Sequence, residues 1–161
     1  MISPLSPGNV IEALGRLPVF TRSLLDEFEE DRLDRLRGRP APKKWSAHGH
    51  AYHLAEVHPL FFDRIDTIPL HEHPTIEPYF PDKAHEDGML LDRDLTTEMT
   101  RFESDRRRPV EKLRALEPED WRRTAAHAEY RRYDLFVMVR HLAMHDLFRA
   151  YRIEEPLLAH D

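Results

Sequence analysis

The sequence predicts an all-α fold: a four-helix bundle with a long connection between the second and third helices. Four stretches of the 161-residue chain carry apolar residues at helical spacing. Glycine is scarce, with 5 residues, and proline is frequent, with 13, so the ends of the helices are marked mostly by proline. No stretch alternates apolar and polar residues as a half-buried strand does. These observations together favour helices packed against helices.

The first predicted helix runs from about Gly8 to about Glu30. We expect a kink at Pro18, because proline lacks the backbone donor and clashes with the preceding turn. Residues 31–37 are expected to add a short helical piece before the segment 38–42, rich in glycine and proline, breaks the pattern. The apolar positions of the first helix are Val10, Ile11, Leu14, Leu17, Leu24, Leu25 and Phe28.

The second predicted helix begins at Ser46, a favoured N-cap residue placed directly before a periodic run that reaches Ile65. Pro59 is expected to kink this helix. Residues 68–88 then form a long irregular connection that contains several prolines. A connection of this length is uncommon in a compact domain unless it has a function or covers a surface. One interpretation is that its tip lies over the mouth of the bundle as a lid.

The third predicted helix runs from about Leu90 to about Leu116, and residues 121–132 follow as a loop. The fourth runs from about Tyr133 to about Leu158. The length suits one domain that covers residues 1–161. Steps of three and four place six residues on one face of the fourth helix: Leu135, Met138, Leu142, His145, Arg149 and Arg152.

The composition argues against several classes of function. With no cysteine there is no disulfide framework, no thiolate zinc site and no cysteine nucleophile. A formal charge of −6 does not favour nucleic-acid binding. No signal peptide and no membrane-spanning stretch is evident, so we expect a cytoplasmic location and no membrane partner. Nucleotide binding and serine hydrolysis lack their glycine-containing motifs.

Two further clusters are interpreted as surface features. Arg101 and the run 106–108 form a basic group on the third helix, but acidic neighbours surround them. We therefore interpret this group as a solvated helix face. Residues 71–73 read His-Glu-His in the long connection, without a third fixed ligand for a metal ion. We interpret them as part of a surface loop.

Histidine is the residue type that points to chemistry. The 11 histidines are roughly three times the usual share of about 2%. His50 and His53 lie three residues apart, and His141 and His145 lie four apart. Both spacings place the pair on one helix face, where two imidazoles can share a metal ion. Neutral imidazole is a usual ligand of zinc, nickel, copper and iron. Such pairs also occur without a metal, so the spacing leaves both interpretations open.

Two motifs occur in the chain, one over residues 45–56 that reads Trp-Ser-Ala-His-Gly-His-Ala-Tyr-His-Leu-Ala-Glu, and one over residues 141–153 that begins His-Leu-Ala-Met-His. Both resemble motifs of the DinB/YfiT-like superfamily of metal-binding four-helix bundles, and the first resembles the second-helix motif. His53 falls at the position of that motif's ligand histidine. The second covers residues 141–153 and resembles the last helix, where His145 matches the first of two ligand histidines. The order of elements agrees over nearly the whole chain.

The sequence departs from the superfamily pattern at two positions. The second histidine of the last helix falls on Arg149, and the acidic residue usual four positions after the Trp falls on Gly49. Members of the superfamily bind a divalent metal through three histidines, of which only His53 and His145 carry over. Arg149 does not replace the third ligand, because its guanidinium stays protonated and offers no lone pair.

Three outcomes remain open at this position. In the first, the metal site is lost and Arg149 forms an ion pair with a carboxylate such as Glu56 or Asp146, as a buried charge requires. In the second, the site is shifted and His141 or His50 supplies the third ligand. In the third, the site binds an anion directly.

Direct anion binding would use Arg149 and Arg152, with His53 and His145 as additional donors. The planar guanidinium of arginine suits carboxylate and phosphate groups.

The resemblance implies an enzyme that depends on a divalent metal, zinc or nickel. Its reaction would be the transfer of a low-molecular-weight thiol to a small-molecule substrate, or a related hydrolysis. Glu56 or Asp146 would orient an imidazole ligand. The alternative is a non-enzymatic, metal-free bundle with a polar network around Arg149, acting as a small-molecule-binding or stress-associated accessory protein. Relatives often pair, so the resemblance also implies a homodimer.

Overall fold

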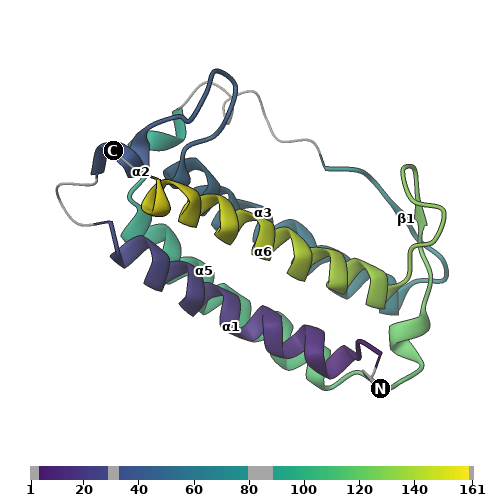
Figure 1. Cartoon of the computed structure of the whole chain (residues 1–161). Helices are drawn as coiled ribbons and strands as arrows, with labels where there is room; N and C mark the ends of the chain where they lie inside the picture. The colour runs from purple at the N-terminus through teal and green to yellow at the C-terminus, as the bar shows by residue number, and fades with distance from the viewer. Residues whose placement is uncertain (1–3, 29–32, 80–88, 160–161) are drawn as a thin grey trace.

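A computed structural model of the chain describes residues 4–28, 33–79 and 89–159. Four long helices dominate it: α1 (Pro7–Asp26), α3 (Ala47–Leu70), α5 (Leu95–Arg114) and α6 (Leu135–Leu158) (Figure 1). The short elements are α2 (Leu33–Arg37), β1 (Thr75–Ile76), the 3-10 helices η2 (Met89–Asp92) and η3 (Asp120–Arg122), and β2 (Ala126–His127). The prediction of a four-helix bundle is confirmed.

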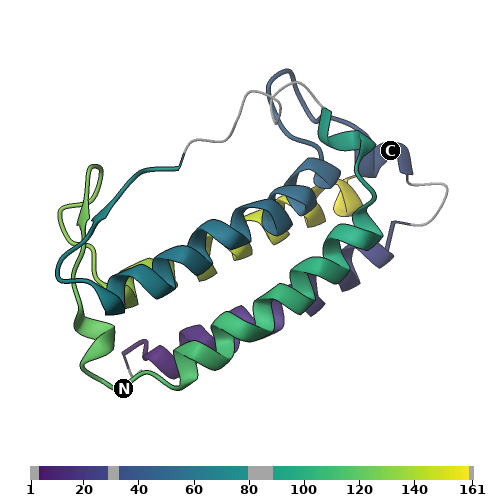
Figure 2. The same cartoon turned by 180° about the vertical axis from the view of Figure 1, so that it is seen from behind.

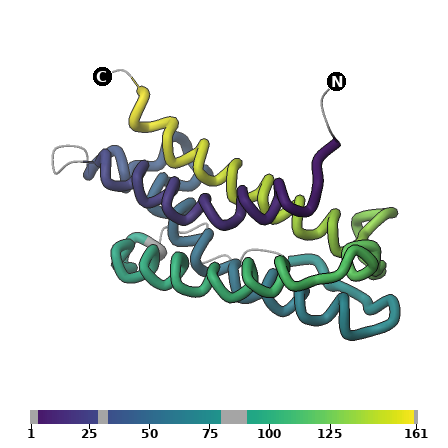
Figure 3. Tube along the Cα trace, turned by 90° about the horizontal axis from the view of Figure 1, so that it is seen from below, coloured from purple at the N-terminus to yellow at the C-terminus, as the bar shows by residue number. Residues whose placement is uncertain are grey.

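The long helices are not arranged in simple up-and-down order. Both α1 and α3 pack against α5 and α6, so α1 and α3 lie diagonally across the bundle although α3 is the next long helix in the chain (Figures 1 and 3). Helices α1 and α6 run in one direction, and α3 and α5 run in the other (Figure 2). Because α3 and α5 start at the same end of the bundle, the chain between them has to return along its length. This explains the long connection that the sequence predicts.

Each long helix begins at a side-chain cap. Ser46 Oγ accepts a hydrogen bond from the backbone nitrogen of Gly49 over 3.0 Å, which confirms the predicted start of α3. The third helix begins later than predicted, at Leu95 rather than Leu90. The reason is that Asp94 accepts from the first-turn nitrogens of α5, while residues 89–92 form η2 instead.

Three other predicted boundaries differ from the structure. Helix α1 ends at Asp26, while the predicted end at Glu30 lies outside the described residues. Helix α3 continues to Leu70, so residues 68–70 belong to the helix and not to the connection. The loop predicted at residues 121–132 contains part of η3 and the strand β2. Strand β2 pairs in parallel with β1, a tertiary contact that has no local sequence signal.

The pairing of β1 with β2 fixes the start of the connection that follows α3. The backbone nitrogen of Ala126 donates to the carbonyl of Pro74 over 2.9 Å. Buried Arg64 on α3 donates to the carbonyl of Glu77 over 2.6 Å and to the hydroxyl of Tyr133 over 3.4 Å. Residues 71–73 are exposed, as predicted. Among the described helices, none combines the length and the hydropathy needed to cross a membrane.

The interior consists of two apolar clusters separated by a polar layer. One cluster surrounds the start of α1 and α6 and the end of α3 and α5, and the other lies towards the opposite end of the bundle. Between them, buried polar side chains enter from all four long helices: Thr21, His58, Arg106 and Asp146. This layer lies directly beside the residues that the sequence marks as a metal site.

Candidate metal centre and adjoining arginine

His53 and His145 face each other across the interface of α3 and α6. Their Nε2 atoms lie 3.1 Å apart. Two nitrogens bound to one tetrahedral zinc ion at about 2.1 Å each are separated by roughly 3.4 Å. His53 is only 1% exposed and the side chain of His145 is 16% exposed, so the pair lies largely below the surface of the bundle. The contact is a hydrogen bond between the two rings, and its length is close to the separation that a shared metal ion needs, so a bound ion would replace this hydrogen bond.

Asp146 and Arg149 fix the tautomer of His145. Nδ1 of His145 lies 3.2 Å from Oδ1 of Asp146, and Nε of Arg149 donates to Nε2 of His145 over 3.3 Å. A guanidinium only donates, so Nε2 of His145 must carry a lone pair and Nδ1 must carry the proton. A carboxylate that holds the far nitrogen of an imidazole in this way is the usual companion of a metal-ligating histidine.

Arg149 sits where the superfamily pattern has its third ligand. Its Nη1 lies 3.1 Å from Nδ1 of His50, and its guanidinium carbon lies 4.5 Å from the ring centre of Trp45. Burial is the main reason that the pKa of Arg149 falls to about 10, so the group stays charged at neutral pH. Burial, with the charges of Arg149 and Arg152, lowers the pKa of His50 to about 3 and keeps it a neutral acceptor.

Two candidate residues lie away from this group. His141 is exposed one turn before His145, and its ring lies 5.5 Å from that of Tyr130. Glu56 is half-buried. Its carboxylate acts on Tyr52 of the same helix, whose pKa is raised first by burial and then by the charge of Glu56. Within the part of the chain that the structure describes, no three histidine or acidic side chains are grouped so as to hold a metal ion.

Arg106 corrects one sequence interpretation. It was predicted on a solvated face of α5, yet its side chain is only 3% exposed in the middle of the bundle. Its Nη2 lies 2.8 Å from Oδ2 of Asp146, and it donates to Nδ1 of His58 and to the carbonyl of Leu14, both over 3.3 Å. Arg106 therefore joins all four long helices. The interpretation was wrong because the spacing of Met99, Phe102, Arg106, Val110 and Leu113 places Arg106 in the apolar row.

The carboxylate of Asp146 is held in its charged form. Its burial alone would raise the pKa, but Arg106 and the hydrogen bond with His145 outweigh this effect and lower the pKa below its ordinary value. Oδ1 of Asp146 thus faces His145, and Oδ2 faces Arg106. Among the described residues, Arg149 forms no ion pair, so the proposed pairing of Arg149 with Asp146 is not formed.

Tyr79 and His58 are parts of this region that the sequence did not indicate. The ring of Tyr79 lies 6.2 Å from that of His53. The described start of the connection, up to Tyr79, therefore lies near His53. The tip of the connection, to which the lid interpretation refers, lies within residues 80–88, outside the described residues. His58 contacts Arg106 and the ring of Phe102. His58 lies three residues before Phe61 in the apolar row of α3, and this position was the sequence signal that its side chain is buried.

The chain as a whole is similar to proteins of a known superfamily. The family model of the DinB superfamily matches residues 13–148, and the chain belongs to this superfamily. Its fold is similar to that of YfiT from Bacillus subtilis, described as "a probable metal-dependent hydrolase with an unusual four-helix bundle topology". The two chains are 18% identical with a TM-score of 0.72, over 96% of this chain and 85% of YfiT. Among curated proteins, none matches the sequence significantly.

Proposed function

We propose that this protein is a metal-dependent enzyme in which His53 and His145 hold one divalent ion, zinc or nickel. The observation that carries the proposal is the 3.1 Å separation of the two Nε2 atoms, together with the contact of Asp146 to His145. Both histidines come from rigid, adjacent helices, as a preformed metal site requires. The description of YfiT as a metal-dependent hydrolase supports the same class of chemistry.

With only two protein ligands, half of the positions of a tetrahedral ion would be left for water or substrate. A bound divalent ion would lower the pKa of a thiol or of water and make it nucleophilic at neutral pH. Asp146 would keep His145 oriented, and Arg106 would keep Asp146 ionised. Arg149 would have to release Nε2 of His145, and its charge would then be available to an anionic group of the substrate.

The reaction we propose is transfer of a low-molecular-weight thiol to an electrophile, with hydrolysis as the related reaction. The absence of cysteine from the chain agrees with a thiol that arrives as cosubstrate. An assay with two arms tests this proposal. Tag-free protein loaded with zinc or nickel is given glutathione, coenzyme A or cysteine with a bimane electrophile, and separately nitrophenyl esters.

The proposal predicts turnover that depends on the metal in at least one arm. This turnover should be lost in both His53→Ala and His145→Ala and retained in His71→Ala, a change at an exposed histidine of the loop. Turnover that survives removal of the metal, or that is unchanged in His53→Ala, would contradict the proposal. The absence of turnover in both arms would contradict it as well.

One observation favours a second candidate, a metal-free bundle that binds a small molecule. Nε of Arg149 donates to the lone pair of His145 that a metal would need. A cation in this position also repels a divalent ion. The two candidates differ in one measurable property, namely whether the tag-free protein binds a divalent metal stably.

We also propose that the protein forms a homodimer through α6. Four apolar side chains on the outer face of this helix are 46% to 71% exposed, and the adjacent α1 adds two that are 54% and 62% exposed. An exposed row of this kind is typical of a protein interface. The side chains are Met144, Leu147, Tyr151 and Leu158 on α6, with Val19 and Phe20 on α1.

A further inference from the structure

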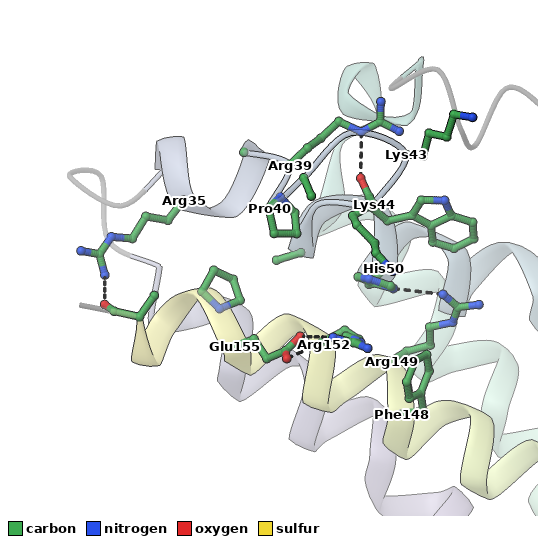
Figure 4. Close-up of a pocket in the computed structure, with 16 residues that line it drawn as sticks. Arg35, Arg39, Pro40, Lys43, Lys44, His50, Phe148, Arg149, Arg152 and Glu155 are labelled. Carbon is green, nitrogen blue, oxygen red and sulfur yellow. Dashed lines mark hydrogen bonds and ion pairs between the residues drawn. The ribbon is translucent and has the colours of Figure 1, made fainter. Parts of the chain in front are cut away.

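A cavity of about 890 Å³ opens beside the histidine pair, between residues 38–45 and the C-terminal half of α6 (Figure 4). Its volume lies in the range of sites that hold a small organic molecule, roughly 300 to 1,000 Å³. His50 and Arg149 form part of its wall, so the cavity adjoins the metal centre without containing His53 or His145.

The charge of this cavity is opposite to that of the chain. Six cationic side chains and a single carboxylate, that of Glu155, line it, whereas the chain as a whole has a formal charge of −6. Glu155 is bound to Arg152 through contacts of 2.8 and 3.1 Å. A concave surface lined by charges of one sign concentrates ligands of the opposite sign. The six side chains are Arg35, Arg39, Lys43, Lys44, Arg149 and Arg152.

Arg149 is the cation of the cavity that most needs an anion. It is half-buried, and its two described hydrogen bonds go to the imidazoles of His145 and His50. Within the described residues, no carboxylate lies at ion-pair distance from it. A partly buried charge without a counter-ion is costly, and an anion in the cavity would offset that cost.

The apolar part of the wall indicates an organic anion rather than a simple ion. The rings of Trp45 and Phe148 both lie near Arg149, with ring centres 4.5 and 5.6 Å from its guanidinium carbon. Pro40 and Pro156 extend the apolar surface. Pockets that bind small molecules commonly combine apolar walls with a few charged groups that fix orientation.

We infer that this cavity binds a small organic anion, whose carboxylate or phosphate is held by Arg149 and Arg152 and whose apolar part packs on Trp45 and Phe148. Bidentate hydrogen bonding by guanidinium suits either acid group. This inference goes beyond the proposed metal chemistry, because the cavity and its charges require no metal.

Isothermal titration calorimetry on the full chain, freed of metal by a chelating resin, tests the inference. The probes are phenyl phosphate and benzoate, with inorganic phosphate and phenol as controls that each lack one half of the recognised chemistry. We expect one of the aromatic anions to saturate a single site, with an affinity about tenfold higher than either control. Whichever of the two aromatic anions binds more tightly identifies the acid group that the site prefers.

Arg149→Met should weaken this binding by about tenfold, because it removes a charge-assisted hydrogen bond while an unbranched apolar stem remains. Arg131→Met, an equal charge change at an exposed residue before the opposite end of α6, should leave the affinity unchanged. Arg152→Met, at a less buried position, should weaken binding in the same direction and covers the case in which Arg149→Met does not fold.

Two results would overturn the inference. One is the absence of saturation by both aromatic anions, and the other is wild-type affinity in folded Arg149→Met and Arg152→Met. Because the protein is metal-free throughout, neither result depends on whether the metal proposal is correct.

Discussion

Nε of Arg149 lies 3.3 Å from Nε2 of His145, the same nitrogen that faces Nε2 of His53 across 3.1 Å. The lone pair of His145 that would bind the proposed metal ion is therefore already engaged by the guanidinium of Arg149. The two residues are four apart on α6, so helical spacing brings them together. It sets this chain apart from the three-histidine pattern that the sequence otherwise resembles.

Replacing Arg149 with histidine should strengthen metal binding. Arg149→His removes the competing donor and the repelling charge, and it supplies an imidazole at the position of the missing third ligand. We expect zinc to bind at least about tenfold more tightly than to the wild type, as measured by competition with a chromogenic chelator. Arg149→Gln is the matched control, because it removes the charge without adding an imidazole. Equal affinities in Arg149→His and Arg149→Gln would contradict the assignment of this position.

The buried pair of Arg106 and Asp146 should be important for stability. Arg106→Met leaves Asp146 as an uncompensated charge in the centre of the bundle, and we expect a loss of about 3 to 5 kcal/mol in the free energy of unfolding. Arg107→Met changes the neighbouring exposed arginine and should cost less than about 0.5 kcal/mol. Urea denaturation of the two variants distinguishes them. Similar losses in both would show that Arg106 does not have the buried role described.

The stability of the protein should fall at mildly acidic pH, in part through His58. Burial and the charge of Arg106 lower the pKa of His58 below its ordinary value of 6.5. As the pH falls through 6.5, the unfolded chain therefore takes up this proton before the folded chain does. The contribution of neutral His58 to stability is thus complete above this pH and is lost progressively below it.

His58→Gln tests this pH dependence, because glutamine can still accept a hydrogen bond from Arg106 but does not titrate. Between about pH 7.5 and about pH 5.5, the wild type should lose up to about 1 kcal/mol more free energy of unfolding than the variant. The pKa of His50 is also lowered, so His50 makes the free energy of unfolding fall with decreasing pH in both the wild type and the variant. Identical pH slopes for the wild type and the variant would mean that His58 does not contribute.

The exposed row on α6 should be a dimer interface. Leu147→Glu places a charge in its middle and should convert a dimer into a monomer, as measured by light scattering after gel filtration. Glu111→Gln, a charge change at an exposed position on α5, should leave the mass unchanged. A monomeric wild type, or a dimer that persists in Leu147→Glu, would contradict this interface.

Much of the fold could be predicted because its signals are local. The N-cap at Ser46 and the apolar periodicity identify the long helices, and the break at residues 38–42 separates the first two. The diagonal placement of α1 and α3 could not be predicted, because it depends on which helix faces meet. The β1–β2 pair was missed for the same reason, since two residues in each strand carry no recognisable pattern.

The candidate site shows the same division between local and tertiary information. His53, His145 and Arg149 were identified because each occupies a position in a short motif, and the role of the two histidines in metal binding remains a prediction. Arg106 was misplaced because its charged neighbours outweighed its position in the apolar row of α5. The contact between Arg149 and His50 depends on the packing of α3 against α6, which the sequence does not contain.

The most direct test of the metal centre is the zinc content and zinc affinity of tag-free protein. We expect one zinc or nickel ion per chain, with a raised melting temperature in the presence of the metal, because a ligand that binds only the folded state stabilises it. His53→Ala should abolish both effects, and His71→Ala, at the exposed loop, should retain them. A wild type that binds no metal and keeps the same melting temperature, or a His53→Ala variant that binds metal as the wild type does, would contradict the proposed metal centre.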